Sequence, residues 1–210
     1  MKKKIELELI KFDLDILDYL NKKNPVTKLS IISKENNINQ LTNFLNEYQY
    51  NLQRDIVLKQ VKKGKVKFSS DIILDKNNFN EFKYIINGYI SDAEVDLLNQ
   101  FKLENINFNF KIKENIINIE QLKLSLNKNL ISSEKLNIKK VKEIYEIDGN
   151  LKTIKSKINL YDYSKLTNIN FDILKDQKVN LSSDNNLSFK INKKLKISDL
   201  NIESFLSFDE

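Results

Sequence analysis

The sequence predicts an all-β-dominated fold, a repetitive antiparallel sheet that is curved or forms a groove, with one short helical segment near the N-terminus. Three observations support this prediction. Apolar and polar residues alternate with a period of two along most of the chain. The connections between alternating runs are too short for crossover helices, which favours antiparallel pairing. Two stretches of the chain also match one another in order and composition, as in repeat proteins.

The alternation begins near the N-terminus and is clearest in the middle of the chain. Apolar residues alternate with Glu6 and Glu8 over 5–9, and the pattern then shifts by one residue, so we expect a β-bulge near Leu9 and Ile10. The later runs place their apolar residues on one side of a strand. These residues are Val66, Phe68, Ile72 and Leu74; Ile106, Phe108, Phe110 and Ile112; Leu122, Leu124 and Leu126; and Leu187, Phe189 and Ile191.

One segment has helical rather than strand periodicity. Apolar residues recur at spacings of three and four over 38–53, and Asn36 or Asn37 could cap the helix. The stretch from Leu17 to Leu20 could form a helical turn before Pro25. We therefore predict strands plus one helix of about 38–53 in a first region, residues 1–60.

The internal match divides the remainder into two β-repeat units, 61–143 and 144–210. Gly88 and Gly149 fall at equivalent places in the match, and a glycine within a strand usually marks a bulge, a bend or a close backbone approach. We predict a repeated sheet bend rather than a ligand site. The matching segments are 84–90 with 145–151, 102–108 with 165–171, and 136–138 with 200–202.

Composition excludes several kinds of catalytic site. The chain has no Cys and no His, which excludes thiol nucleophiles, serine–histidine triads and zinc sites with Cys or His ligands. Its 3 Gly lie far apart, so no glycine-rich phosphate loop is present. The net charge of +6 comes almost entirely from Lys, with Arg54 the only Arg. Specific nucleic-acid sites favour Arg, so we do not expect a nucleic-acid partner.

Carboxylates at alternate positions are the remaining candidates for chemistry. Asp13 with Asp15, and Asp92 with Glu94 and Asp96, would share strand faces, where they could hold Ca²⁺ or act as paired glycosidase acids. Such residues are more typical of the solvated face of an amphipathic strand. We therefore expect neither an enzyme nor a cofactor or metal, and the sequence favours either a closed apolar core or an apolar groove for acyl chains.

The phrase over 84–98, with Gly88 and then Asp92-Ala93-Glu94-Val95, is followed by Leu-Glu-Asn-Ile-Asn-Phe-Asn-Phe at 103–110. This pattern, repeated over 145–171, resembles the AsmA-like proteins of the TamB/AsmA superfamily in Gram-negative envelopes. The resemblance covers residues 60–205 and implies a long sheet rolled into a groove that carries phospholipid between the inner and outer membranes. Members usually begin with a transmembrane anchor, which this chain lacks, so we expect a fragment of a longer chain.

The resemblance leads to a functional hypothesis with named residues. The chain would be a lipid-binding segment in the periplasm or on the inner membrane, with phospholipid acyl chains and other envelope proteins as partners. The alternative is a structural or adhesive β-repeat protein with a closed core. The expected groove wall consists of Ile106, Phe108, Phe110, Ile112, Leu122, Leu124, Leu126, Ile169, Phe171, Ile173, Leu187, Phe189 and Ile191.

Overall fold

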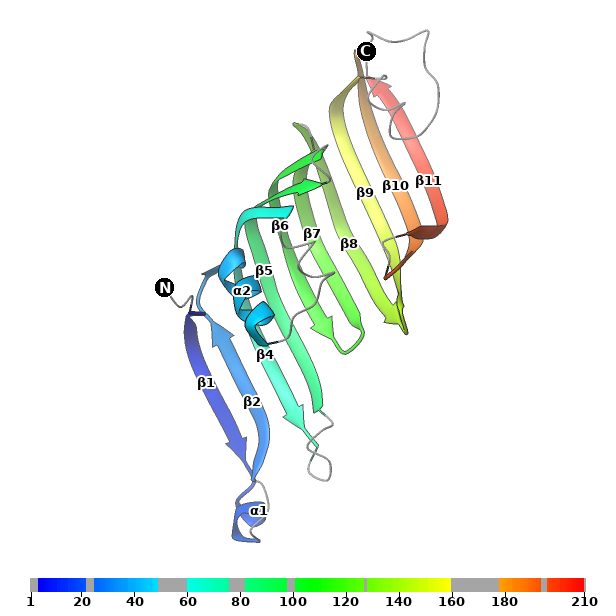
Figure 1. Ribbon diagram of the computed structural model, residues 1–210. Helices are drawn as coiled ribbons and strands as arrows, with labels where there is room; N and C mark the ends of the chain where they lie inside the picture. The colour runs from blue at the N-terminus through cyan, green and yellow to red at the C-terminus, as the bar shows by residue number, and fades with distance from the viewer. Residues whose placement is uncertain are drawn as a thin grey trace.

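The computed structural model describes residues 4–21, 25–48, 60–75, 82–97, 101–126, 128–159, 178–193 and 196–209. In these ranges the chain forms one eleven-stranded antiparallel sheet and two short helices (Figure 1). This confirms the fold class that the alternation predicts. The strands are β1 (Leu7–Leu14), β2 (Val26–Ser33), β3 (Asn36–Asn37), β4 (Val61–Leu74), β5 (Phe82–Leu97), β6 (Phe101–Lys113), β7 (Ile116–Leu126), β8 (Asn129–Val141), β9 (Ile144–Asn159), β10 (Lys178–Asn192) and β11 (Ile197–Asp209).

The sheet is a meander, in which each strand pairs with the strand before it and the strand after it. Its order is β1-β2-β4-β5-β6-β7-β8-β9-β10-β11, and the short β3 pairs with β4. The two edge strands, β1 and β11, lie at opposite ends and do not pair with each other, so the sheet is open (Figure 1). Two-residue turns join β6 to β7 and β8 to β9, which is why these neighbours run antiparallel.

Irregular positions interrupt the ladder where the alternation slips. The pairing of β1 with β2 shifts between Leu7 and Leu9, which confirms the predicted bulge. Asp92, Asn105 and Gln121 have positive φ angles of 50°, 52° and 55° and lie at or beside further register shifts in β5, β6 and β7. Each shift adds a residue to one strand while the apolar side chains keep to one face.

The helices lie where the helical spacing predicts them. The longer one, α2 (Ile38–Tyr48), starts at the predicted position, while residues 49–53 lie outside the described residues. Asn37 provides the cap, since its Oδ1 accepts a hydrogen bond from the Asn39 amide at 2.9 Å. The short α1 (Ile16–Leu20) is capped by Asp15 and confirms the helical turn before Pro25.

The buried core lies between α2 and the middle of the sheet. Its five buried apolar residues come from α2 and four neighbouring strands, β4 to β7, and α2 lies in front of β4 (Figure 1). A Cβ on Gly64 would lie 2.6 Å from Ile38 Cδ1, so the glycine allows the helix to approach β4 closely. The core residues are Ile38, Val66, Ala93, Ile106 and Leu122.

The two glycines of the internal match lie in one row that crosses the sheet. The row runs from β4 to β11, and glycine occupies two of its eight positions while large apolar side chains occupy the other six. Lys165–Phe171 lies outside the described residues, and β10 pairs directly with β9, so the boundaries of the two units stay a prediction. The row is Phe68, Gly88, Phe110, Ile119, Leu136, Gly149, Leu187 and Ile202.

Candidate functional site

One face of the sheet carries a continuous row of branched apolar side chains. Residues directly opposite one another in paired strands point to the same face, so a chain of cross-strand partners defines a line of side chains. This line passes through nine strands with a single polar member, Ser70. We call it the isoleucine row: Ile10, Ile31, Ser70, Ile86, Ile112, Ile117, Ile138, Ile147 and Phe189.

The adjacent row, one residue along each strand, is polar and lies on the opposite face. Asn137 in this row donates a hydrogen bond from Nδ2 to Asp148 Oδ2 at 2.7 Å. The separation of the two rows shows that the alternation in sequence becomes two chemically different faces. The polar row is Ser69, Asn87, Lys111, Asn118, Asn137, Asp148, Ser188 and Asn201.

Most of the described wall residues lie on the apolar face, but their surroundings differ. Ile106 and Leu122 are buried at 8% exposure and belong to the cluster that includes Ile38 of α2, so they are core residues. Phe108, Phe110 and Leu124 pack against that core and are half-buried. The other described wall residues are half-buried outside this core cluster: Ile112, Leu126, Leu187, Phe189 and Ile191. Ile169, Phe171 and Ile173 lie outside the described residues.

The apolar face is covered unevenly within the described ranges. There, α2 is the element that packs on it, through Ile38 and Leu41. The isoleucine row from Ile112 to Phe189 is half-buried and lies outside the core cluster. Within the described part of the chain, the buried members of this face lie on β4–β7, and the row members from β6 to β10 are half-buried.

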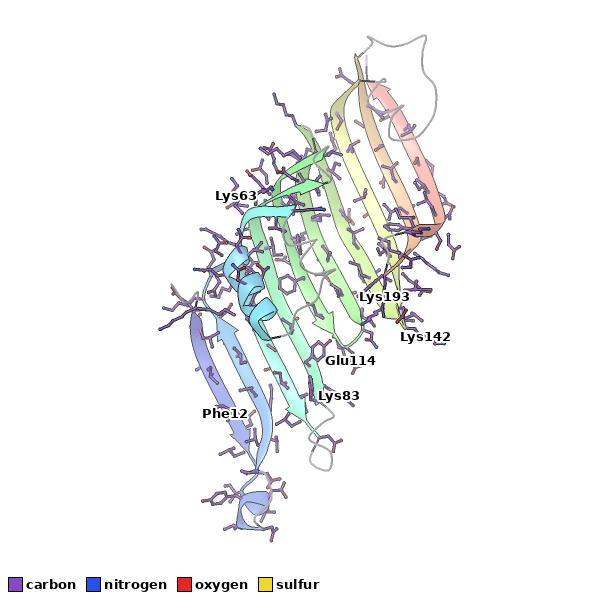
Figure 2. All side chains as sticks on the ribbon, in the orientation of Figure 1. Phe12, Lys63, Lys83, Glu114, Lys142 and Lys193 are labelled. Carbon is purple, nitrogen blue, oxygen red and sulfur yellow. The ribbon has the colours of Figure 1, made fainter. Side chains whose placement is uncertain are left out.

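The apolar face ends in a polar border at the turns between β6 and β7 and between β8 and β9. Lys140 is cross-strand partner to Tyr145, which in turn pairs with Ile191, so all three share the apolar face. Tyr84 lies at the same end of β5 and donates a hydrogen bond to the Glu114 backbone carbonyl at 2.9 Å. This end of the sheet carries Lys83, Glu114, Lys142 and Lys193 (Figure 2).

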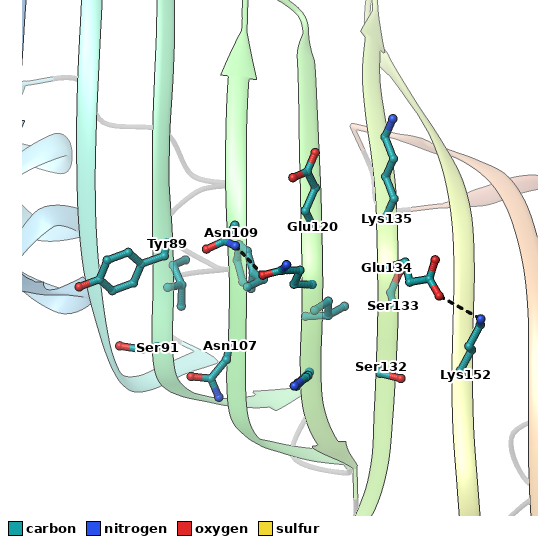
Figure 3. Close-up of a pocket in the computed structure, with 15 residues that line it drawn as sticks. Tyr89, Ser91, Asn107, Asn109, Glu120, Ser132, Ser133, Glu134, Lys135 and Lys152 are labelled. Atoms are coloured by element: carbon teal, nitrogen blue, oxygen red, sulfur yellow. Dashed lines mark hydrogen bonds and ion pairs between the residues drawn. The ribbon is translucent and has the colours of Figure 1, made fainter.

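A hollow of about 900 Å³ is lined mainly by polar side chains of the opposite face, and Ile90, Phe108 and Leu122 also line it (Figure 3). It lies beside the bulges of β6 and β7. Asn109 donates a hydrogen bond to Gln121 Oε1 at 3.0 Å, and Asn107 accepts one from the bulged Asp92 amide at 3.2 Å. These amides stabilise the irregular backbone, so much of the hollow's polar lining has a structural role.

One lysine that lines this hollow is paired with two carboxylates. Lys152 contacts Glu134 at 3.2 Å and Asp184 at 3.4 Å, and hydrogen bonds with these two carboxylates raise the pKa of the lysine (Figure 3). The carboxylates singled out in sequence behave similarly, since Glu94 contacts Lys63 at 2.6 Å and Asp96 contacts Lys62 at 3.5 Å. Ion pairs of this kind are typical of a solvated sheet face.

The described residues offer no arrangement for metal chemistry and no membrane-spanning helix. Within the described ranges, no three Asp or Glu side chains are placed to hold a metal ion. No helix in those ranges combines the length and hydropathy needed to cross a bilayer. The arrangement that stands out chemically is therefore the apolar face and its polar border.

Comparison with known proteins gives no relative. No protein-family model, curated protein sequence or solved structure matches the chain. Function is consequently inferred from the geometry of the sheet and from the resemblance noted in the sequence.

Several residues of the site are absent from the predicted wall. Ile86, Ile117, Ile138 and Ile147 lie in the isoleucine row, and Lys140 lies at its border. The position of Lys140 could have been predicted from the alternation alone. Counting by twos from Leu136 through Ile138 reaches Lys140 and not its neighbour Lys139, which places a lysine on the apolar face.

Proposed function

We propose that the chain binds phospholipid acyl chains along its apolar face, as a segment of an AsmA-like protein that moves phospholipid between the inner and outer membranes. The observation that supports this proposal is the isoleucine row. It crosses nine strands, so with a strand spacing of about 4.8 Å it extends over roughly 38 Å. This is longer than the hydrocarbon core of a whole bilayer, about 30 Å.

The row favours a passive mechanism. Its members are almost all isoleucine, so the surface that an acyl chain meets changes little from one strand to the next. Full burial of such a side chain stabilises a complex by about 1.5–3 kcal/mol, and a half-buried one has only part of that left to gain. Many small and similar gains would hold a chain while letting it move along the sheet without covalent chemistry.

The same proposal includes a place and partners. A surface for acyl chains between two membranes would operate in the periplasm or at the inner membrane of a Gram-negative envelope. Its partners would be phospholipids and other envelope proteins that deliver and receive them. No catalytic role is part of the proposal.

A structural β-repeat is the second candidate, and one observation favours it. Ile106 and Leu122 are buried in the core cluster that includes Ile38 of α2, so part of the apolar face is used as protein core. In a purely structural protein the rest of the face would be covered in the same way and would bind no lipid.

A pair of adjacent substitutions separates the two candidates. Phe108→Asp removes a side chain packed against the core and would destabilise the fold under either candidate. Ile117→Asp instead places a charge on the half-buried row, and Asn118→Asp places the same charge on the opposite face one residue away. We expect both proteins to fold and only Ile117→Asp to lose lipid.

The measurement combines native mass spectrometry for co-purified phospholipid with circular dichroism of each variant. An acyl-chain surface is supported if phospholipid co-purifies with the wild-type and Asn118→Asp proteins but not with a folded Ile117→Asp protein. If the wild-type protein carries no lipid and the Ile117→Asp variant unfolds, the lipid-binding proposal fails and the structural β-repeat replaces it.

A further inference from the structure

A small hollow lies at the border of the apolar face, next to the isoleucine row. Its volume is about 210 Å³. Ile112, Ile117 and Ile138 line it from three consecutive strands and belong to the row itself. The other lining residues carry polar or charged groups: Tyr84, Glu114, Asn115, Lys140 and Tyr145.

This composition differs from both faces of the sheet. The apolar row ends here, and over about two residues the lining changes from isoleucine to tyrosine and lysine. Tyrosine and lysine combine an apolar body with a polar tip, so both are suited to a boundary between hydrocarbon and water. The hollow therefore matches an amphiphile, whose chain would lie on the row and whose head would lie among the polar groups.

The charged groups indicate what kind of head this would be. Lys140 makes no ion pair within the described part of the chain, although Glu114 lines the same hollow. A cation and a carboxylate that share a hollow without closing on each other can each take an opposite charge from a ligand. A head with a phosphate and an amine supplies both charges in one group.

We infer that this hollow binds the zwitterionic head of a phosphoethanolamine lipid, with its phosphate at Lys140 and its amine at Glu114. The inference depends on the proposed acyl-chain surface and adds the class of head group to it. Tyr145 stands beside Lys140 as its cross-strand partner and could donate its hydroxyl to the same phosphate. Tyr84 is oriented by its hydrogen bond to the Glu114 carbonyl and would flank the amine.

The border also carries further lysines that would attract an anionic phosphate from solution. Lys83 and Lys142 lie along the same end of the sheet (Figure 2). Lys193, also at this end, is engaged by Glu143. Exposed charges of this kind act over about one Debye length, near 8 Å at physiological salt, so they would assist capture more than they would hold the bound head.

The test uses single-chain probes and substitutions in the full chain. Dodecyl phosphoethanolamine, dodecyl phosphate and dodecanol are titrated below their aggregation concentrations by isothermal calorimetry. We expect Lys140→Gln to weaken both phosphate-bearing probes about fivefold and to leave dodecanol unchanged. Glu114→Gln should weaken only the probe that carries an amine.

Two controls make the outcomes distinct. Lys139→Gln removes the same charge one residue away on the opposite face, and it should change no affinity. Phosphoethanolamine without a chain should bind far more weakly than the dodecyl ester. If it binds equally well, the hollow is a site for a free zwitterion and the lipid assignment is wrong.

The remaining outcomes separate this inference from the proposed function. If all three dodecyl probes bind equally and Lys140→Gln changes nothing, the acyl-chain surface stands and the head-group site is refuted. If none of the probes binds the wild-type protein, the proposed function fails and the head-group site fails with it. If only Lys140→Gln has an effect, the site takes anionic heads in general and the assignment of Glu114 is overturned.

Discussion

Replacing Gly149 with alanine tests the reasoning about the central glycine row. A Cβ at this position would lie 2.5 Å from the Lys135 carbonyl oxygen and 2.6 Å from Leu136 Cδ2. The φ angle of Gly149 is 157°, a conformation that residues with a side chain rarely adopt. Alanine would therefore face both a steric clash with the backbone of β8 and an unfavourable dihedral angle.

The size of the effect follows from these two contributions. Overpacking costs about 1–3 kcal/mol, and a glycine-only dihedral costs about 1–3 kcal/mol more. Alanine also lowers the conformational entropy of the unfolded chain, which offsets about 0.4–1 kcal/mol of this destabilisation. We expect a net loss of about 1–5 kcal/mol in the free energy of unfolding. Gly88→Ala meets a similar clash, 2.4 Å from the Lys67 carbonyl oxygen, without the positive φ, and should lose at most about 2.5 kcal/mol.

Urea titration followed by circular dichroism measures the loss, and hydrogen exchange assigns it to β9 or β5. Adding Leu136→Ala to Gly149→Ala should restore only part of the stability, because the clash with the Lys135 carbonyl remains. A Gly149→Ala protein as stable as the wild type, or a larger loss for Gly88→Ala, would refute the reasoning.

Three further predictions concern other parts of the sheet. Lys142→Gly should raise the free energy of unfolding by about 1 kcal/mol in a denaturant titration, because Lys142 holds a φ of 56° in a two-residue turn. Hydrogen bonds from Ser30 and Lys28 lower the pKa of Asp71, so Asp71→Asn should reduce stability at neutral pH. That difference should be lost as pH falls below about 3.9 and through the lowered folded pKa, as thermal unfolding at several pH values would show. Asn36→Ala should cost about 2 kcal/mol and speed amide exchange in β1, because the buried side chain makes three hydrogen bonds to backbone groups.

The sequence predicted the architecture well because its strongest signal is local. A period of two with short polar turns is compatible with little besides an antiparallel sheet, and the helical spacing that begins at Ile38 stands out against it. The wall residues of β6 and β7 were assigned to one face correctly for the same reason. The cross-strand neighbours of each wall residue could not be obtained in this way.

Register depends on bulges that the residue types do not reveal. Asn105 and Gln121 adopt positive φ angles although neither is glycine, and each moves the following residues by one position relative to the neighbouring strand. The isoleucine row therefore emerges only once the strands are paired. The depth of burial could not be predicted either, since Ile106 and Ile112 look identical in the alternation but only the first belongs to the buried core.

The meander has a consequence for how the molecule comes apart. Strands make their main contacts with their immediate neighbours, so free energy is distributed along the sheet as a series of nearest-neighbour terms. Melting can then start at an outer hairpin such as β10–β11 and proceed inward while β4–β7 stay paired. Heat or denaturant should therefore unfold the sheet one hairpin at a time from its edge. A spectroscopic probe on β11 should report a lower unfolding midpoint than a probe on β4, next to α2.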